Sequence, residues 1–222
     1  MKNLNKIKTF ISESEQGTIF TTPEWLEAVA PGNWDYIINE SAGSIKACMP
    51  IILNQKLGFT ICNMPPFTQS LGIMYPAVEG KYAEVLTRKI NALSELISVI
   101  PKNSYFRQRL HPSITNWLPF YWQGYNQSTR YTYVIKDLVD QDKIWKSFRS
   151  NIRQEIRKAS KTIKIFQDDD FDALSFCIDS TFARQKNKNF DFYTLKNIFD
   201  ACKKLKNGKI FLAKNGKEIC GA

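Results

Sequence analysis

The sequence predicts an α/β protein with mixed sheets, arranged in two lobes of which the second is incomplete. Helical periodicity alternates with short β-rich runs, and this alternation begins twice along the chain. Apolar residues make up 43% and charged residues 23% of the 222 residues, as in a globular chain long enough to bury a core. The segment 134–142 joins the two series, so we place the lobes at residues 1–136 and 137–222.

The first lobe is expected to begin its regular structure with a helix after Thr22. A hydroxyl at the cap, Pro23 at the first helical position and Glu24 in the first turn form a typical helix start. Alternating apolar residues then predict strands, and Pro65 and Pro66 end the third of them. The expected elements are strands at 34–39, 45–53, 59–64, 105–110 and 130–135, a helix at about 81–99, and a short helix or turn at 114–121.

The second lobe is expected to begin with one long helix, capped by Asp140 or Asp142 and running to about Ser160. A strand at 162–166 and helices at 171–185 and 193–205 follow. The dipeptide Asn215–Gly216 predicts a two-residue hairpin turn between arms at 209–213 and 218–222. Because the second arm is short and leaves a sheet edge uncovered, we expect a truncated form of a longer protein.

Several classes of protein are disfavoured by the composition. The N-terminus lacks the apolar run of a signal peptide, and no stretch has the roughly 18–20 apolar residues of a membrane span, which favours a cytoplasmic protein. The five cysteines include no C-x-x-C pair, so we expect reduced core thiols. His111 is the only histidine, which limits catalytic triads and metal sites to one imidazole. We predict no metal site, and we expect Asp168–Asp170 to cap the helix that follows.

Positive charge is concentrated in one segment of a chain whose net charge is +10. Residues 143–164 hold eight basic side chains and one acidic side chain. On one long helix, an apolar stripe from Trp145 to Ala159 would be buried, flanked by a basic ridge. Like charges four residues apart cost about 0.2–0.5 kcal/mol per pair, so the ridge is either a solvated face or a cradle for phosphate or carboxylate. The ridge residues are Arg149, Arg153, Arg157 and Lys161.

The motifs around this ridge resemble those of the FemAB family, the Fem-type peptidoglycan-bridge aminoacyltransferases and their GNAT-like relatives. The run 130–138, then Trp145, then the arginines spaced by four residues is similar to the join between the two lobes of that family. The run 19–26 resembles its opening helix, and 64–69 resembles the loop after its early hairpin. The resemblance covers most of residues 18–166 and the final hairpin.

The resemblance implies two GNAT-like lobes and the transfer of an acyl or aminoacyl group to an amine. The acceptor would be a small or nucleotide-linked molecule, such as a cell-wall precursor, and acyl-CoA or aminoacyl-tRNA could be the donor. No cofactor is firmly implied. In that family, basic residues at the lobe interface hold the pyrophosphate of the substrate. The matching residues of this chain are those of the ridge. Cleft residues implied by the same motifs are Gln69, Arg130, Tyr131 and Tyr133.

One departure bears on the donor. GNAT-type acetyl-CoA users hold the pyrophosphate with a glycine-rich turn at a helix N-terminus. The nearest segment, 69–73, lacks the second small residue of that turn, which favours an aminoacyl or related donor.

Two alternatives remain open at this point. The chain could be a non-catalytic nucleic-acid-binding module that uses residues 143–164, with Tyr131, Tyr133 and Trp145 as stacking groups. It could also be a fragment with no activity of its own. The sequence names neither a general base nor an oligomeric state.

Overall fold

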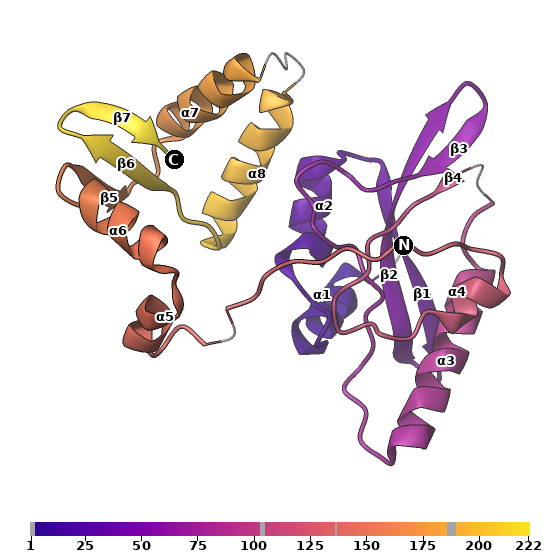
Figure 1. Cartoon of the computed structure of the whole chain (residues 1–222). Helices are drawn as coiled ribbons and strands as arrows, with labels where there is room; N and C mark the ends of the chain where they lie inside the picture. The colour runs from indigo at the N-terminus through magenta and orange to yellow at the C-terminus, as the bar shows by residue number, and fades with distance from the viewer. Residues whose placement is uncertain (1–2, 103–104, 136, 186–189) are drawn as a thin grey trace. The chain divides into compact units, whose positions relative to one another are not determined.

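The computed structural model describes residues 3–102, 105–135, 137–185 and 190–222. The chain divides into two compact units, unit 1 (Met1–Gln127) and unit 2 (Ser128–Ala222). Both contain helices and an antiparallel hairpin, which confirms the predicted α/β class with mixed sheets (Figure 1). The lobe boundary at 136/137 stays a prediction, and Lys136 lies outside the described residues.

Unit 1 is built on one sheet with strand order β1-β2-β3-β4. The first three strands are antiparallel neighbours, and β4 pairs with β3 in parallel. Its elements are α1 (Leu4–Glu13), a 3-10 turn (Ile19–Thr21), α2 (Pro23–Val29), β1 (Trp34–Ser41), β2 (Ser44–Lys56), β3 (Phe59–Cys62), α3 (Tyr82–Ser98), β4 (Tyr105–Phe106) and α4 (Leu118–Trp122).

Local sequence accounts for the start of α2 and for the first hairpin. The Thr22 hydroxyl accepts a hydrogen bond from the Trp25 backbone N–H at 3.3 Å, and Pro23 occupies the first helical position. Ala42 and Gly43 form the two-residue turn between β1 and β2, with φ of 49° and 73°. A turn with two positive φ angles matches the twist of antiparallel strands.

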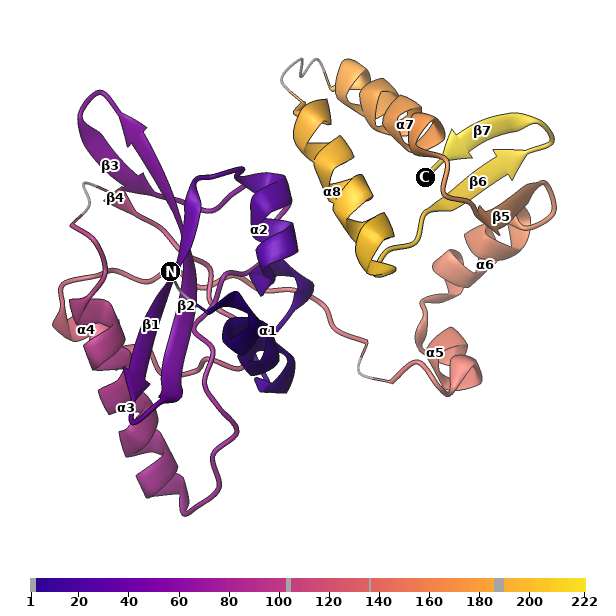
Figure 2. The same cartoon turned by 180° about the vertical axis from the view of Figure 1, so that it is seen from behind.

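The sheet of unit 1 is covered on both faces. Alternate residues of β2, including Met49 and Ile51, pack in one core cluster with Leu93 and Leu96 of α3. On the other face, the Tyr36 hydroxyl donates a hydrogen bond of 2.6 Å to the Thr21 carbonyl oxygen. Figures 1 and 2 show α1 and α2 on one side of the β1–β2 hairpin and α3 and α4 on the other. The sheet of unit 1 is therefore the middle layer of a core with helices on both sides.

Unit 2 contains a smaller antiparallel sheet of order β5-β6-β7. Three of its helices begin at an aspartate whose carboxylate accepts a backbone N–H, namely Asp140, Asp170 and Asp191. Asp170 therefore has the capping role predicted for the acidic cluster. The elements are α5 (Gln141–Ser147), α6 (Ser150–Ala159), β5 (Ile163–Gln167), α7 (Phe171–Arg184), α8 (Phe192–Leu205), β6 (Phe211–Asn215) and β7 (Glu218–Gly221).

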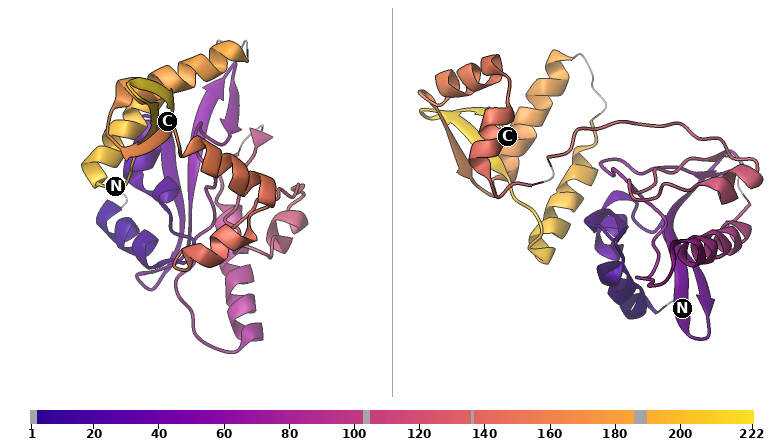
Figure 3. Two further views of the ribbon diagram at one scale, coloured as in Figure 1. Left: turned by 60° about the vertical axis from the view of Figure 1, so that its left-hand side comes forward. Right: turned by 60° about the horizontal axis from the view of Figure 1, so that its bottom comes forward.

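The prediction of one long helix from Asp140 to Ser160 is wrong. Phe148 is extended, with ψ of 144°, and separates α5 from α6. Periodicity alone concealed the break, because the apolar and basic spacings continue across it. The prediction of a strand at 130–135 is also wrong, since this segment has neither helix nor strand and is exposed (Figure 3). Its β-branched and aromatic residues favour a strand, but the described residues provide no neighbouring strand.

Smaller differences concern element ends and one missed helix. The strand expected at 105–110 is only β4, and the final hairpin turns at Gly216–Lys217, one residue later than expected. Helix α1 has no strong cap in the sequence apart from Asn3, whose side chain accepts the Lys6 N–H at 3.2 Å. All five cysteines are free, and Cys48 and Cys62 are buried as expected, whereas Cys220 is exposed.

Candidate functional site

The four predicted ridge residues are centred on α6. Arg153 and Arg157 lie one turn apart on this helix, Arg149 is the residue before its first turn, and Lys161 follows its end. The structure therefore places Arg153 and Arg157 on one helix, whereas Arg149 and Lys161 lie just outside its two ends. Within the described ranges, no carboxylate forms an ion pair with any of the four.

Arg157 is held against an aromatic pair at the break between α5 and α6. Its guanidinium carbon lies 5.4 Å from the centre of the Trp145 ring, and Trp145 contacts Phe148 edge-on at 6.2 Å. A cation over an aromatic face is attracted to the ring while its N–H groups remain available. Trp145 thus orients Arg157, a role that the sequence pattern did not indicate.

The N-terminus of α6 differs from those of α5, α7 and α8. No side chain caps it, and its first turn contains no acidic residue. Its first backbone N–H groups are therefore open to an external acceptor, and the helix dipole adds positive potential at this end. Arg149 stands next to these groups and Arg153 one turn on. An uncapped helix N-terminus beside arginines is chemically suited to a phosphate or carboxylate group.

The apolar stripe expected on this helix is not buried. Ile152 and Ile156 are 46% and 42% exposed, and α6 contains no buried residue. The prediction of a buried face on this helix is therefore wrong for the described residues. The helix α6 is amphipathic, but none of the residues on its apolar stripe is buried against another element.

The predicted cleft residues fall in both units. Gln69 is exposed in a loop of unit 1, while Arg130, Tyr131 and Tyr133 belong to the extended segment of unit 2. Tyr131 is 94% exposed and Tyr133 fully exposed. Each residue is placed within its own unit only, so a shared cleft stays a prediction.

The segment 69–73 does not form a free phosphate-binding turn. The Leu71 N–H already donates to the Arg109 carbonyl oxygen at 2.9 Å. A Cβ on Gly72 would lie 2.7 Å from the His111 backbone nitrogen, so this glycine is required by close packing. The segment is therefore part of the backbone core of unit 1.

His111 lies in a structural hydrogen-bond network. Its Nδ1 accepts the Ser113 N–H at 3.2 Å and lies 2.9 Å from the Ser113 hydroxyl. Gln16 donates to the same hydroxyl at 3.0 Å and accepts the Tyr75 N–H at 3.1 Å. The network connects the segment after α1 to two loops that are distant in sequence. His111 therefore has a structural role that requires no catalytic function.

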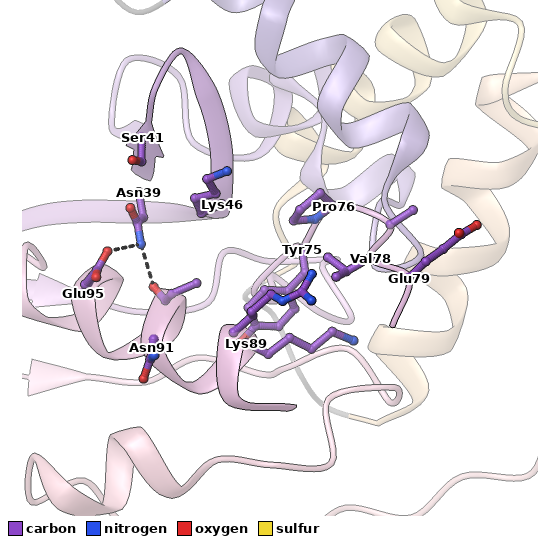
Figure 4. A pocket seen from close by; sticks show the side chains of 13 residues that line it. Asn39, Ser41, Lys46, Tyr75, Pro76, Val78, Glu79, Lys89, Asn91 and Glu95 are labelled. Carbon is purple, nitrogen blue, oxygen red and sulfur yellow. Dashed lines mark hydrogen bonds between the residues drawn. The ribbon is translucent and has the colours of Figure 1, made fainter. Parts of the chain in front are cut away.

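A cavity of about 600 Å³ opens in unit 1, and no motif in the sequence indicates it. It lies between the ends of β1 and β2, the loop 75–79 and the helix α3 (Figure 4). The Asn39 amide donates to the Ala92 carbonyl oxygen at 3.1 Å and to the Glu95 carboxylate at 2.8 Å, which fixes β1 to α3 at its edge. The charged residues that line the cavity are three basic ones, Lys46, Arg88 and Lys89, and two acidic ones, Glu79 and Glu95.

Two features are lacking among the described residues, a membrane-spanning helix and a metal-binding cluster. No helix there is both long enough and apolar enough to span a bilayer. No group of three or more His, Cys, Asp or Glu residues among them could hold a metal ion.

The fold can be compared with solved structures. A crystal structure of FemX superposes with a TM-score of 0.61, over 96% of this chain and 57% of that chain, at 17% sequence identity. The chain has a Fem-type fold. It spans little more than half the length of the FemX chain, and at this identity the likeness concerns the fold alone. No protein-family model matches the sequence, and no curated protein matches it.

Proposed function

We propose that the chain is, or forms part of, a Fem-type acyl- or aminoacyltransferase that acts on an amine of a nucleotide-linked precursor. The observation that carries this proposal is the likeness to FemX over 96% of the chain. The motifs at 19–26, 64–69 and 130–161 support it independently, because they resemble the same family. Aminoacyl-tRNA is the donor class that we favour, since the glycine-rich turn of acetyl-CoA users is lacking at 69–73.

The phosphate-binding element of this proposal is α6 with its flanking residues. Arg149, Arg153 and the uncapped N-terminus of α6 supply donors at one end of the helix. Arg157, oriented by Trp145, and Lys161 continue the positive surface toward the other end. Each charge-assisted contact with a phosphate contributes about 1.5–3 kcal/mol, which exceeds the repulsion of about 0.2–0.5 kcal/mol per like-charged pair.

The chemistry needs little from this surface besides position and charge. The acceptor amine attacks the donor carbonyl carbon, a C–N bond forms, and the ester C–O bond breaks. The amine loses a proton and the leaving alkoxide gains one. Fixing the pyrophosphate of the acceptor would place its amine near the carbonyl, and correct orientation alone accounts for a large share of acyl-transfer rates.

The proposal is tested by titrating the protein with uridine diphosphate and following heat or intrinsic fluorescence. We expect saturable binding that Arg153→Ala weakens by about 1–3 kcal/mol, the usual contribution of a charged hydrogen bond. Lys158→Ala is the matched control, because Lys158 lies on the same helix but about 140° around the axis from Arg153. Equal loss in both variants would indicate unspecific charge attraction, and no binding to any uridine nucleotide would contradict the proposal.

A second candidate function is binding of single-stranded nucleic acid. The exposure of Tyr131 and Tyr133 favours it, because base stacking requires open aromatic faces. This function predicts RNA binding that falls steeply with salt and is indifferent to free uridine nucleotides. Tyr133→Ala would then weaken RNA binding, and the chain would show no saturable binding of uridine diphosphate for Arg153→Ala to weaken.

A further inference from the structure

The hairpin formed by β2 and β3 ends in a turn whose first residue is unfavourable for its conformation. Leu57 and Gly58 are the two turn residues, with φ of 51° and 80°. A turn with two positive φ angles favours asparagine or aspartate followed by glycine, because a bulky side chain strains that conformation. Leu57 nevertheless occupies the first position and is 88% exposed. Neither the turn nor burial in a core therefore favours leucine here.

Exposed apolar side chains continue from this turn along one face of the sheet. Lys56 pairs with Phe59 and Ile61 pairs with Tyr105, so these four residues share a face. Phe59 is 58% exposed, and Tyr105 is exposed as well. Farther along β2 the helices α1 and α2 cover the same face, where the Tyr36 hydroxyl bonds to Thr21, whereas the end of the hairpin extends beyond them (Figure 1). Neighbouring apolar side chains at a projecting end indicate a contact surface.

The charged side chains of these three strands are all basic. The acidic residues of unit 1 fall within 13–40 and 79–95, so β2, β3 and β4 contain none. Lys56 is the last residue of β2, directly before the turn. Arg107 follows β4, and its N–H donates to the Cys62 carbonyl oxygen at 2.8 Å, so it lies on the face of Tyr105. The end of the hairpin therefore combines apolar and aromatic side chains with exposed cations.

This combination matches the surface of an anionic lipid bilayer. Aliphatic side chains enter the boundary of the acyl chains, and tyrosine rings lie at the level of the headgroups. Lysine and arginine extend toward the lipid phosphates and are attracted by the negative surface potential. An apolar contact and a basic contact are both needed, because one alone gives marginal and reversible binding. The hairpin supplies both within a few residues.

We infer that the β2–β3 hairpin binds the surface of an anionic lipid bilayer, with Leu57 and Phe59 inserted among the lipids. Lys56 and Arg107 then contact the headgroups on either side of the inserted residues. The strained leucine of the turn is explained in this way, since the side chain that the turn disfavours is the one that enters the bilayer. The inference concerns unit 1 and does not depend on the transferase proposal.

The test measures binding of the full chain to lipid vesicles by co-sedimentation. One set of vesicles is pure phosphatidylcholine, and the other contains phosphatidylcholine and phosphatidylglycerol in about equal amounts. We expect binding to the anionic vesicles to be at least about tenfold tighter, because their surface potential attracts the basic side chains. Hydrogen exchange on the anionic vesicles should be slowed at residues 54–61, where the hairpin meets the lipid.

Variants that keep the charge separate insertion of the hairpin from attraction of the basic helix α6 to the same vesicles. Leu57→Asn puts the favoured residue into the turn, and Phe59→Thr keeps a β-branched residue in the strand. Each should weaken binding to anionic vesicles about fivefold or more, because each removes apolar surface from the lipid. The melting temperature of Leu57→Asn should be unchanged or higher, which excludes misfolding as the cause. Ala42→Asn, at the corresponding position of the β1–β2 turn, is the matched control and should leave the affinity unchanged.

Four results would each overturn the inference. They are no binding to either kind of vesicle up to about 5 mM lipid, a range that covers weak peripheral binding, equal binding to neutral and anionic vesicles, an unchanged affinity in Leu57→Asn or Phe59→Thr, and slowed exchange confined to residues 149–161. A contact surface for another protein would give the first of these results, and attraction through α6 alone would give the last two.

Discussion

Unit 1 and unit 2 each combine an antiparallel hairpin with helices, but they bury apolar side chains to very different extents. In unit 1 the sheet is covered on both faces, and Leu26, Met49 and Leu96 are fully buried. In unit 2 the buried apolar residues among those described are Ala173, Ile198 and Leu212. Large apolar residues such as Ile152, Phe166 and Phe176 stay exposed there. Regular elements alone therefore do not make a core, because the apolar face of a sheet must also be buried against another layer.

The same difference separates the two kinds of site. The cavity of unit 1 is formed by side chains that a rigid core holds in place. The basic surface of unit 2 depends on a helix with no buried residue, so its geometry is held by Trp145 and Phe148 rather than by a core. The comparison predicts a more stable unit 1 and a unit 2 that gains order from its ligand.

The largest expected effect is the loss of stability on truncating a core leucine of unit 1. Leu96→Ala should lower the free energy of unfolding by about 2–5 kcal/mol, because Leu96 is fully buried between α3 and the sheet. Ile156→Ala in α6 removes a 42% exposed side chain and should cost under about 1 kcal/mol. Denaturant unfolding of both variants measures the difference, and similar costs would show that α6 is packed in solution.

Hydrogen exchange should separate the two hairpins. Residues 45–64 lie in the covered sheet of unit 1, whereas 209–222 form the central strand β6 and the edge strand β7 of a sheet with few buried residues. We expect exchange to be about tenfold or more faster at 209–222, a ratio that corresponds to about 1.4 kcal/mol in opening free energy. Equal protection would mean that the edge of unit 2 is covered in solution, and the contrast between the units would fail.

Alkaline pH should destabilise unit 1. Burial raises the pKa of Tyr75 in the folded chain, so the unfolded chain releases that proton first, near pH 10. The contribution is therefore present below pH 10 and is lost as the pH rises above it. At pH 11 the loss is about 1.4 kcal/mol from this tyrosine. Tyr75→Phe should flatten the dependence of stability on pH between 10 and 11, and an unchanged slope would contradict a buried phenol.

A smaller effect is expected at a helix cap of unit 2. The Asp191 carboxylate accepts the Thr194 hydroxyl at 2.6 Å and the Thr194 N–H at 2.9 Å, and these bonds lower its pKa. Asp191→Ala should cost about 1 kcal/mol, and the contribution should vanish as the pH falls through the lowered pKa. Asp200→Ala, which removes only the surface pair with Lys196, is the control and should cost about 0.5 kcal/mol or less. Equal costs in thermal unfolding would show that the cap contributes nothing specific.

The sequence predicted best where local chemistry and burial agree. The start of α2, the β1–β2 hairpin and α3 are set by a cap, a turn and an apolar period, and the core of unit 1 reinforces each. Residues 130–135 and the long helix were predicted wrongly because both patterns assume neighbours that the described residues do not supply. Pairing and burial are tertiary properties, and no local signal contains them.

The candidate sites divide in the same way. The spacing of Arg149, Arg153 and Arg157 is visible in the sequence, because helical neighbours recur every four residues. The uncapped start of α6 follows from the break at Phe148 and could not be predicted from that spacing. The cavity joins Lys46, Tyr75 and Lys89 from three separate elements, so only the folded chain reveals it.

The most direct test of the central claim is where uridine diphosphate binds on the chain. An amide-resolved NMR titration of the full chain reports every backbone N–H at once. We predict saturable shifts concentrated at residues 149–161, strongest at the first N–H groups of α6, and their loss in Arg153→Ala but not in Lys158→Ala. Shifts concentrated elsewhere, or none at all, would contradict a phosphate-binding role for α6.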